Sequence, residues 1–278
     1  MTPRTFPVEH VLRIMPDADG EPAAPPPAAV DTAALLDRLR AARGRGPAAL
    51  ALDGDGTLWR PDVGHHLVER TLAARRVLPA ALPPLQSLAR RHDLALADDP
   101  NDQLARIVAA YLAGDIPPAE AYRVGGIMFA GHDPAGARAW GERVVADLGP
   151  TFHIAPAWTL VLDWARAADV EVWLVSAGGW PGALAAARRA GIAPDRVIAC
   201  TFDDPRAGHP PPIPHGPGKP QLLRARTGAR LLAAFGDDRH DAPLLAAAEL
   251  PVALAGTAAA HLRLPGLLCW HPEPTRLP

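Results

Sequence analysis

Residues 49–59 read ALALDGDGTLW, an unbroken run of apolar residues that ends in two acids, Asp53 and Asp55. A short run without polar alternation is typical of a strand buried on both faces, as in a parallel sheet. Two carboxylates placed so close together repel each other, and Gly56 and Thr57 follow them at once. The stretch therefore predicts a buried strand that brings two acids to a functional site.

The same succession of helix, short apolar run and abrupt polar end recurs along the chain. A helix beginning at Asp31 or Thr32 has Leu35, Leu36 and Leu39 on one face and ends before Gly44. Further helical patterns occupy residues 156–169 and 219–227. Runs that we expect to be strands occupy residues 170–176, 196–202, 230–236, 251–256 and 266–270. Buried strands alternating with helices predict an α/β fold, a doubly wound parallel sheet.

Residues 64–150 have a different sequence pattern: their apolar residues follow helical spacing, and no strand-like run occurs among them. We expect an all-helical insert here, within a core made of residues 31–63 and 151–278. Residues 1–30 are rich in Pro and Ala and predict a flexible lead-in. The Pro-rich residues 208–219 predict a surface loop.

Composition narrows the class of partner. A formal charge of −2 over 278 residues provides no basic field, which argues against a nucleic-acid partner. No segment approaches 18 uncharged apolar residues, so neither a membrane partner nor export is indicated. Cys200 and Cys269 lie in apolar stretches and indicate buried thiols of a reducing compartment. We expect a cytoplasmic protein with a small-molecule substrate; the oligomeric state stays open.

Polar residues gather where the predicted strands end. In open α/β sheets the ligand lies beyond the carboxyl ends of the strands, so these residues are expected to share one crevice. Several carboxylates in one crevice, with no His or Cys beside them, favour a hard cation such as Mg²⁺. The candidates are Asp53, Asp55, Ser176, Asp237, Asp238 and Asp241, with Lys219 just before the helix that precedes the third of these strands.

The two acids of the first stretch can have different tasks, since alternate residues leaving a strand point in different directions. One carboxylate can attack a phosphoryl group while the other handles the proton. Lys219, the Ser176 hydroxyl and the backbone N–H groups of residues 54–57 are donors for the charge that then develops. Lys219 is the only lysine in the chain, which suggests that a compact ammonium is required there.

Four segments, DGDGT, the Ser in VWLVSAGG, the Lys in GPGKP, and GDDRHD, together resemble the four motifs of the haloacid dehalogenase superfamily. The helical insert resembles the small cap of its phosphoserine phosphatase-like branch. The resemblance implies that Asp53 is the nucleophile, Asp55 the general acid and base, and Ser176 and Lys219 the phosphate-binding pair. It also implies Mg²⁺ held by Asp53, the main-chain carbonyl of Asp55 and Asp237, with Asp241 supporting the metal or the lysine. Asp238 is an alternative metal ligand.

Substrate contacts are predicted at two levels. The phosphate site is expected to include Gly56, Thr57, Ala177 and Gly178. By resemblance to the phosphoserine phosphatases, Asp62 falls where a glutamate holds the substrate ammonium, and Arg123 where an arginine holds the carboxylate. Trp59 and Trp180, each directly after a motif, would line one substrate pocket or pack in the core. If the two rings line a pocket opposite Asp62, that pocket would suit a quaternary ammonium such as that of choline phosphate.

The resulting expectation is a Mg²⁺-dependent phosphatase that hydrolyses a small phosphorylated metabolite through an aspartyl-phosphate. Dehalogenation by the same nucleophile needs neither a metal nor a second acid, so Asp55 and the acids of residues 237–241 argue against it. Phosphotransfer or phosphomutase chemistry differs only in the acceptor and stays open, as does a catalytically idle binding protein of this fold. His65, His66 and His240 are expected to be surface or cap-packing residues rather than metal ligands.

Overall fold

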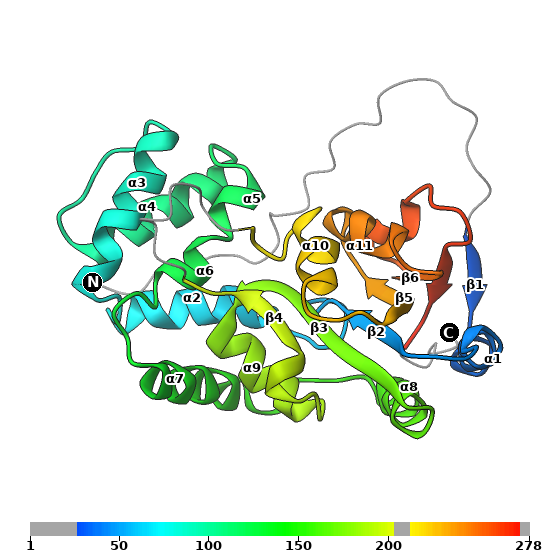
Figure 1. Cartoon of the computed structure of the whole chain (residues 1–278). Helices are drawn as coiled ribbons and strands as arrows, with labels where there is room; N and C mark the ends of the chain where they lie inside the picture. Colours follow the sequence, from blue (N-terminus) through cyan, green and yellow to red (C-terminus); the bar gives the residue numbers. More distant parts are fainter. Residues whose placement is uncertain (1–26, 203–211, 273–278) are drawn as a thin grey trace, which may run out of the picture.

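The computed structural model describes residues 27–202 and 212–272, and its centre is a seven-stranded, all-parallel sheet (Figure 1). The strand order is β1-β7-β6-β5-β2-β3-β4, so β2 lies between β5 and β3 at the middle of the sheet. The strands are β1 Ala28–Val30, β2 Ala48–Leu52, β3 Val170–Gly179, β4 Val197–Cys200, β5 Arg230–Gly236, β6 Leu250–Leu254 and β7 Leu268–Trp270.

Helices cover both faces of this sheet, which confirms the predicted α/β fold (Figure 1). One face packs against α1 (Thr32–Ala42), α8 (Pro156–Ala167) and α9 (Trp180–Arg189). The other packs against α10 (Gly218–Arg224) and α11 (Ala242–Ala246). The side chains of β2 alternate between two hydrophobic clusters, Leu50 and Leu52 in one and Ala49 and Ala51 in the other. A strand apolar on both faces is what two covering layers require.

Between β2 and β3 the described residues form helices and loops only. Each of the longer helices begins at a capping carboxylate or a proline of its first turn, as helix-start preferences predict. These helices share their own hydrophobic cluster. They are α2 Val63–Ala73, α3 Leu82–Arg91, α4 Pro100–Ala113, α5 Pro118–Ala121, α6 Val124–Ile127 and α7 Pro134–Asp147. We call residues 63–147 the helical segment.

Glycines let the helical segment approach the core very closely. A Cβ added to Gly141 of α7 would lie 2.2 Å from the Pro181 carbonyl oxygen at the start of α9. A Cβ added to Gly126 of α6 would lie 2.2 Å from the carbonyl oxygen of Thr201, just after β4. Backbone therefore packs directly on backbone at two separate points.

Four sequence expectations need comment. The predicted flexible lead-in was wrong over residues 28–30, which form β1 and pair with β7; the rest of it, residues 1–26, lies outside the described residues. Residues 208–211 of the predicted loop also lie outside them, and residues 212–217 contain no helix or strand. The loop prediction was wrong over residues 218–219, which begin α10. Cys200 and Cys269 are buried and not disulfide-bonded. None of the helices in the described ranges combines the length and apolar character of a membrane span.

Candidate active site

The carboxyl ends of three neighbouring strands bring the predicted motifs together. Asp53 follows β2, Ser176 lies near the end of β3, and Asp237 follows β5. The backbone N–H of Asp53 donates to the Phe235 carbonyl at 3.0 Å, which continues the pairing of β2 with β5 past the last strand residue. Lys219 lies in the first turn of α10. The site thus forms at the carboxyl end of β2, which has β3 on one side and β5 on the other, as expected for this architecture.

Lys219 links two of the acids. Its Nζ donates to Asp53 Oδ1 and to Asp241 Oδ1, each at 2.5 Å, and all three side chains are almost fully buried. Burial opposes the charge of Lys219, but Asp241 and Asp53 raise the pKa of its ammonium above the ordinary value. The second oxygen of Asp241 accepts from the backbone N–H groups of Asp237 and Asp238, each at 3.1 Å. Asp241 is therefore oriented toward Lys219 by the backbone of its own loop.

Three carboxylates, those of Asp53, Asp237 and Asp241, have oxygen atoms within 4.8 Å of one another. Burial raises the pKa of Asp53 well above its ordinary range, and Asp241 and Asp237 raise it further against the effect of Lys219. Burial and the charge of Asp241 raise the pKa of Asp237 to about 6, although Thr57 Oγ1 donates to its Oδ1 at 2.7 Å. Carboxylates crowded in this way fit a divalent hard cation, which would relieve their repulsion.

Gly56 makes the approach of Asp237 possible. Its φ of +82° belongs to the left-handed region, and a Cβ there would lie 2.2 Å from Asp237 Oδ2. The glycine after the second acid of DGDGT is thus required both by the turn and by the carboxylate that packs on it.

Asp55 points away from Lys219, toward the start of α2. Its Oδ1 accepts from Trp59 Nε1 at 2.7 Å and from the Val63 N–H at 2.6 Å, and its Oδ2 from the Gly64 N–H at 3.3 Å. Burial, together with the nearby charge of Asp62, raises the pKa of Asp55 to about 7. The two acids of one loop therefore have different surroundings, one beside an ammonium and one beside neutral N–H donors.

Ser176 and Asp55 border the same small space. Ser176 is buried, and its Oγ accepts from the Gly178 N–H at 3.0 Å. A Cβ added to Gly178 would lie 3.2 Å from Ser176 Oγ and 3.4 Å from Asp55 Oδ2. Ala177 is half-buried, and its carbonyl accepts from Cys200 Sγ at 3.1 Å. Gly178 has no side chain, so none lies between the Ser176 hydroxyl and the Asp55 carboxylate at this position.

Three predicted site residues have contacts that differ from those predicted. Asp238, the alternative metal ligand, is half exposed and accepts from the His240 N–H at 2.9 Å, so it caps the following turn and is not part of the acid cluster. Trp59 is 2% exposed and packs on Phe152, so it is not a pocket wall. Trp180 packs edge-on against Phe129 in the helical segment. The two tryptophans therefore do not face one substrate pocket, because each belongs to a different hydrophobic cluster.

The predicted substrate residues Asp62, just before the helical segment, and Arg123, within it, both have partners in that segment. Asp62 caps α2, with Oδ1 accepting from the His65 N–H at 2.6 Å. Arg123 Nε lies 3.1 Å from Glu120 Oε1, and Glu120 also pairs with Arg91. His65 and His66 both lie near Glu69 on the partly exposed surface of α2. These contacts account for each side chain locally, and the substrate roles of Asp62 and Arg123 stay predictions.

A group of rings between the helical segment and the core was not foreseen. The ring of His215 lies 4.4 Å from that of His240 and 5.1 Å from that of Tyr122. Burial, His240 and Lys219 lower the pKa of His215 to about 4, so its imidazole is neutral near pH 7. In the sequence, only the position of His215 four residues before Lys219 indicates that it lies near the site.

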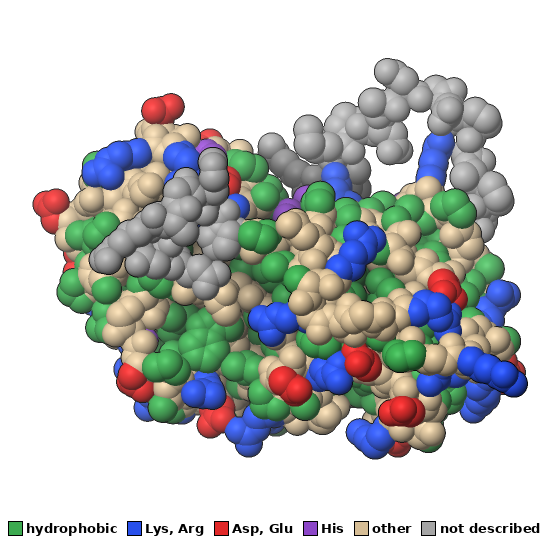
Figure 2. All heavy atoms as spheres, viewed as in Figure 1, with side chains coloured by type: hydrophobic (Ala, Val, Ile, Leu, Met, Phe, Trp, Pro, Cys, Tyr) green, Lys and Arg blue, Asp and Glu red, His purple; other side chains and the backbone are tan. Residues whose placement is uncertain are grey.

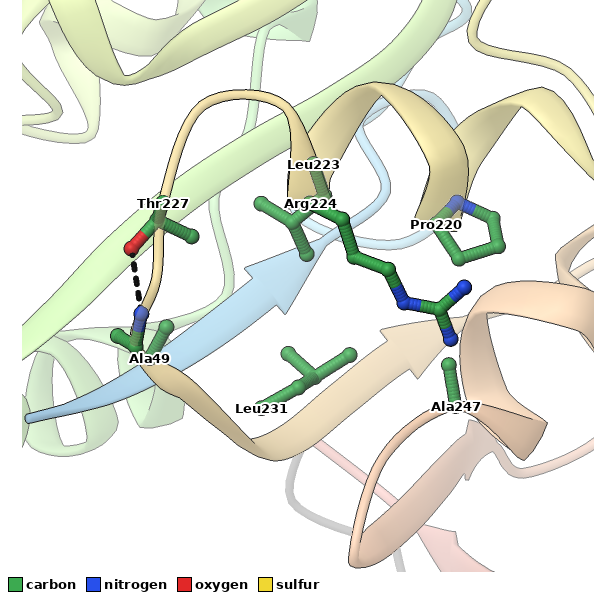
Figure 3. Close-up of a pocket in the computed structure, with 8 residues that line it drawn as sticks. Ala49, Pro220, Leu223, Arg224, Thr227, Leu231 and Ala247 are labelled. Atoms are coloured by element: carbon green, nitrogen blue, oxygen red, sulfur yellow. Dashed lines mark hydrogen bonds between the residues drawn. The ribbon is translucent and has the colours of Figure 1, made fainter.

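Two pockets lined by described residues do not include the acids. Figure 3 shows one of about 150 Å³, across which the Arg224 side chain extends. Its lining includes Ala49, near the start of β2 and therefore at the opposite end of that strand from Asp53. The other is an open groove of about 850 Å³ beside β1 and α8.

On the face shown in Figure 2, acidic and basic side chains are interspersed, with no continuous basic surface among the described residues.

Comparison with known proteins agrees with this architecture. No curated protein matches the sequence. A protein of unknown function from Bordetella pertussis Tohama I has 22% identity, 76% of this chain and 91% of that chain covered, and a TM-score of 0.53. A conserved functionally unknown protein from Anaerococcus prevotii DSM 20548 has 11% identity, 82% and 87% covered, and a TM-score of 0.54. At these identities the matches show a shared fold.

The structural neighbours also include a substrate-bound phosphoserine phosphatase complex, with 13% identity, 81% of this chain and 94% of that chain covered, and a TM-score of 0.45. The sequence profile of the haloacid dehalogenase-like hydrolases matches residues 50–246, which include the strand-end acids, Ser176 and Lys219. The chain therefore belongs to the haloacid dehalogenase-like hydrolase family.

Proposed function

We propose that this hydrolase is a Mg²⁺-dependent phosphatase that cleaves a small phosphomonoester through an aspartyl-phosphate on Asp53. The observation that carries the proposal is the contrast between the two acids of DGDGT. Asp53 belongs to the acid cluster and accepts from Lys219, whose ammonium can neutralise part of the charge of a phosphoryl group. Asp55 has a pKa near 7 and faces the Ser176 side of the same space, as a general acid and base requires.

In the first step, a carboxylate oxygen of Asp53 forms a bond to phosphorus while the bond from phosphorus to the ester oxygen breaks. The proton of neutral Asp55 passes to that ester oxygen, so the alcohol leaves uncharged. Lys219 and the Ser176 hydroxyl donate to the equatorial phosphoryl oxygens, where negative charge is spread. The Lys219 ammonium is already held beside Asp53 and needs little reorganisation.

In the second step, water attacks phosphorus and gives one proton to the Asp55 carboxylate, and the bond from phosphorus to Asp53 breaks. Inorganic phosphate leaves, and Asp53 and protonated Asp55 are restored. A pKa near 7 allows Asp55 to donate in the first step and accept in the second.

The acid cluster fits Mg²⁺, because its donors are carboxylate oxygens, and burial and nearby carboxylates raise the pKa values of two of its members, Asp53 and Asp237. We propose that Asp53, Asp237 and the main-chain carbonyl of Asp55 would hold the ion, whereas Asp241 positions Lys219. When bound, the ion would neutralise negative charge on the transferring phosphoryl group.

We also propose that the helical insert, residues 64–150, is a cap over the core of residues 31–63 and 151–278. A cap above Asp55 and Ser176 would exclude bulk water until hydrolysis and select the alcohol part of the substrate. The first turn of α2 supports this role, since it supplies two of the N–H donors to Asp55.

The test is phosphate release from phosphoserine, phosphocholine, small sugar phosphates and p-nitrophenyl phosphate, with Mg²⁺ and with a chelator. We expect metal-dependent release that Asp53→Asn abolishes in a folded protein. The Asp238→Asn variant is the matched control, because it removes a neighbouring carboxylate that lies outside the cluster. Release that persists in Asp53→Asn would contradict the mechanism, and no release from any compound by the folded, Mg²⁺-replete protein would contradict the proposed function.

A further inference from the structure

The proposed acid Asp55 is held by a side chain that belongs to no catalytic motif. Trp59, four residues further along, donates its indole N–H to Asp55 Oδ1 at 2.7 Å. A hydrogen bond to a carboxylate at this distance is among the stronger kinds in proteins. Trp59 is 2% exposed, so solvent does not compete for this bond.

The indole ring has little freedom to move. The N–H groups of Leu58 and Trp59 both donate to the Gly54 carbonyl, and the Gly56 N–H donates back to the Trp59 carbonyl. Phe152 packs on the ring, with centroids 6.2 Å apart. A Cβ at Gly54 would lie 2.7 Å from Trp59 Cζ2, so the ring lies across the loop because a glycine stands there. The donor is therefore fixed relative to the backbone that carries both acids.

The donors around Asp55 are unequal for its two oxygens. Oδ1 accepts two short bonds, from Trp59 Nε1 and the Val63 N–H, whereas Oδ2 has one contact of 3.3 Å with the Gly64 N–H. An oxygen that already accepts two N–H groups is poorly placed to carry a proton, since its lone pairs are engaged. Oδ2 is also the oxygen on the Gly178 side, toward Ser176.

We propose that Trp59 is a positioning residue for catalysis: by occupying Oδ1, it makes Oδ2 the oxygen that carries the proton and aims it at the ester oxygen of the leaving group. This inference rests on the proposed phosphatase function. It assigns to Trp59 a role separate from core packing. If Trp59 has that role, the loss of kcat/KM on removing its N–H should depend on the leaving group of the substrate.

The test is the Trp59→Phe variant, which keeps an aromatic ring and removes the N–H. An alkyl phosphate needs its leaving oxygen protonated, whereas p-nitrophenyl phosphate releases a stable anion without that help. We expect kcat/KM to fall by about 10- to 100-fold for the alkyl phosphate, a part of the roughly 10²- to 10⁴-fold that a positioned general acid contributes. For p-nitrophenyl phosphate we expect a loss of less than about 3-fold, since only the packing of the ring changes.

Trp173→Phe is the matched control, because Trp173 Nε1 also donates to a carboxylate, Glu171, at 2.7 Å and is buried away from the acids. It should leave the ratio of the two kcat/KM values unchanged. In an Asp55→Asn background, Trp59→Phe should cause no further loss in the residual kcat/KM for the alkyl phosphate, because the two residues act as a unit.

Equal losses for both substrates in folded Trp59→Phe, or no loss for either, would overturn the inference and leave the phosphatase proposal standing. A wild-type protein inactive on both substrates would instead overturn the proposed function and this inference with it. Unfolding curves of each variant in urea separate a catalytic loss from a folding defect.

Discussion

At the scale of single residues, Lys219 contributes both to the proposed reaction and to the stability of the folded protein. Its ammonium lies between Asp53 and Asp241 in a nearly dry environment, so each group depends on the others for its charge. Removing one partner of a buried ion pair leaves an uncompensated charge, which costs far more than the intact pair contributes.

We therefore expect Lys219→Met to lower the free energy of unfolding by about 3–5 kcal/mol at neutral pH. The loss should shrink as pH falls, since Asp53, whose pKa is raised by burial, can then take up a proton. Urea unfolding at pH 5 and pH 8 measures this. Arg224→Met, an exposed position of the same helix, is the control. A Lys219→Met protein as stable as the control at pH 8 would show that the buried charges are not coupled as described.

Asp55 sets the expected pH dependence of the reaction. Its carboxyl is protonated below the raised pKa of about 7, and the acid form is lost as pH rises through that value. For an alkyl phosphate, kcat/KM should fall about tenfold per pH unit above 7. Asp62→Asn removes one of the charges that raise this pKa but keeps a good helix cap, so it should move the fall to lower pH. A pH profile that Asp62→Asn leaves unchanged would contradict the electrostatic link.

At the scale of elements, contacts through glycine hold the helical segment on the core. Helix α7 packs on the start of α9 at Gly141, and α6 approaches the end of β4 at Gly126. These contacts fix the segment that supplies the Val63 and Gly64 amides to Asp55. The position of the proposed acid thus depends on helix packing some distance from it.

Gly141→Ala sets two effects against each other. Alanine in a helix interior is favoured over glycine by about 1 kcal/mol. A Cβ only 2.2 Å from a backbone oxygen must push the two elements apart, and overpacking typically costs about 1–3 kcal/mol. We expect net destabilisation in urea unfolding. Gly228→Ala, where a Cβ meets open space, should be neutral or slightly stabilising. A stabilised Gly141→Ala protein would mean that the helical segment tolerates displacement.

At the scale of the whole molecule, the parallel sheet assembles one site from distant parts of the chain. Thr57 and Asp237, 180 positions apart, are joined by a hydrogen bond of 2.7 Å, and Lys219 reaches Asp53 over 166 positions. Three carboxylates brought together in this way should favour the folded state more strongly when a cation is bound.

Mg²⁺ should accordingly raise the unfolding temperature, with a stabilisation of about 2.7 kcal/mol at a concentration 100 times Kd. Asp237→Asn should lose most of this effect, and Asp238→Asn should retain it, since only Asp237 belongs to the acid cluster. Thermal unfolding with and without Mg²⁺ measures the difference. The reverse pattern would place the ion on the Asp238 side chain.

The sequence by itself determined the fold and the main site candidates. Short apolar runs that end in Asp53, Ser176 and Asp237 identify buried parallel strands, and in such a sheet strand ends necessarily meet at one edge. The pattern is local and periodic, so it can be read without knowing any distant contact. The order of the four segments then indicated the family, which the profile match establishes.

Only the tertiary structure decided which of these side chains face one another. It turned Asp238 outward to cap a turn and Asp241 inward to Lys219, and it placed Trp59 on Asp55 instead of on a pocket wall. It also added β1, whose three residues gain their partners from β7 at the far end of the chain. The physical reason is the same in each case: side-chain direction and strand pairing at these positions are set by contacts with residues remote in sequence, which local spacing does not encode.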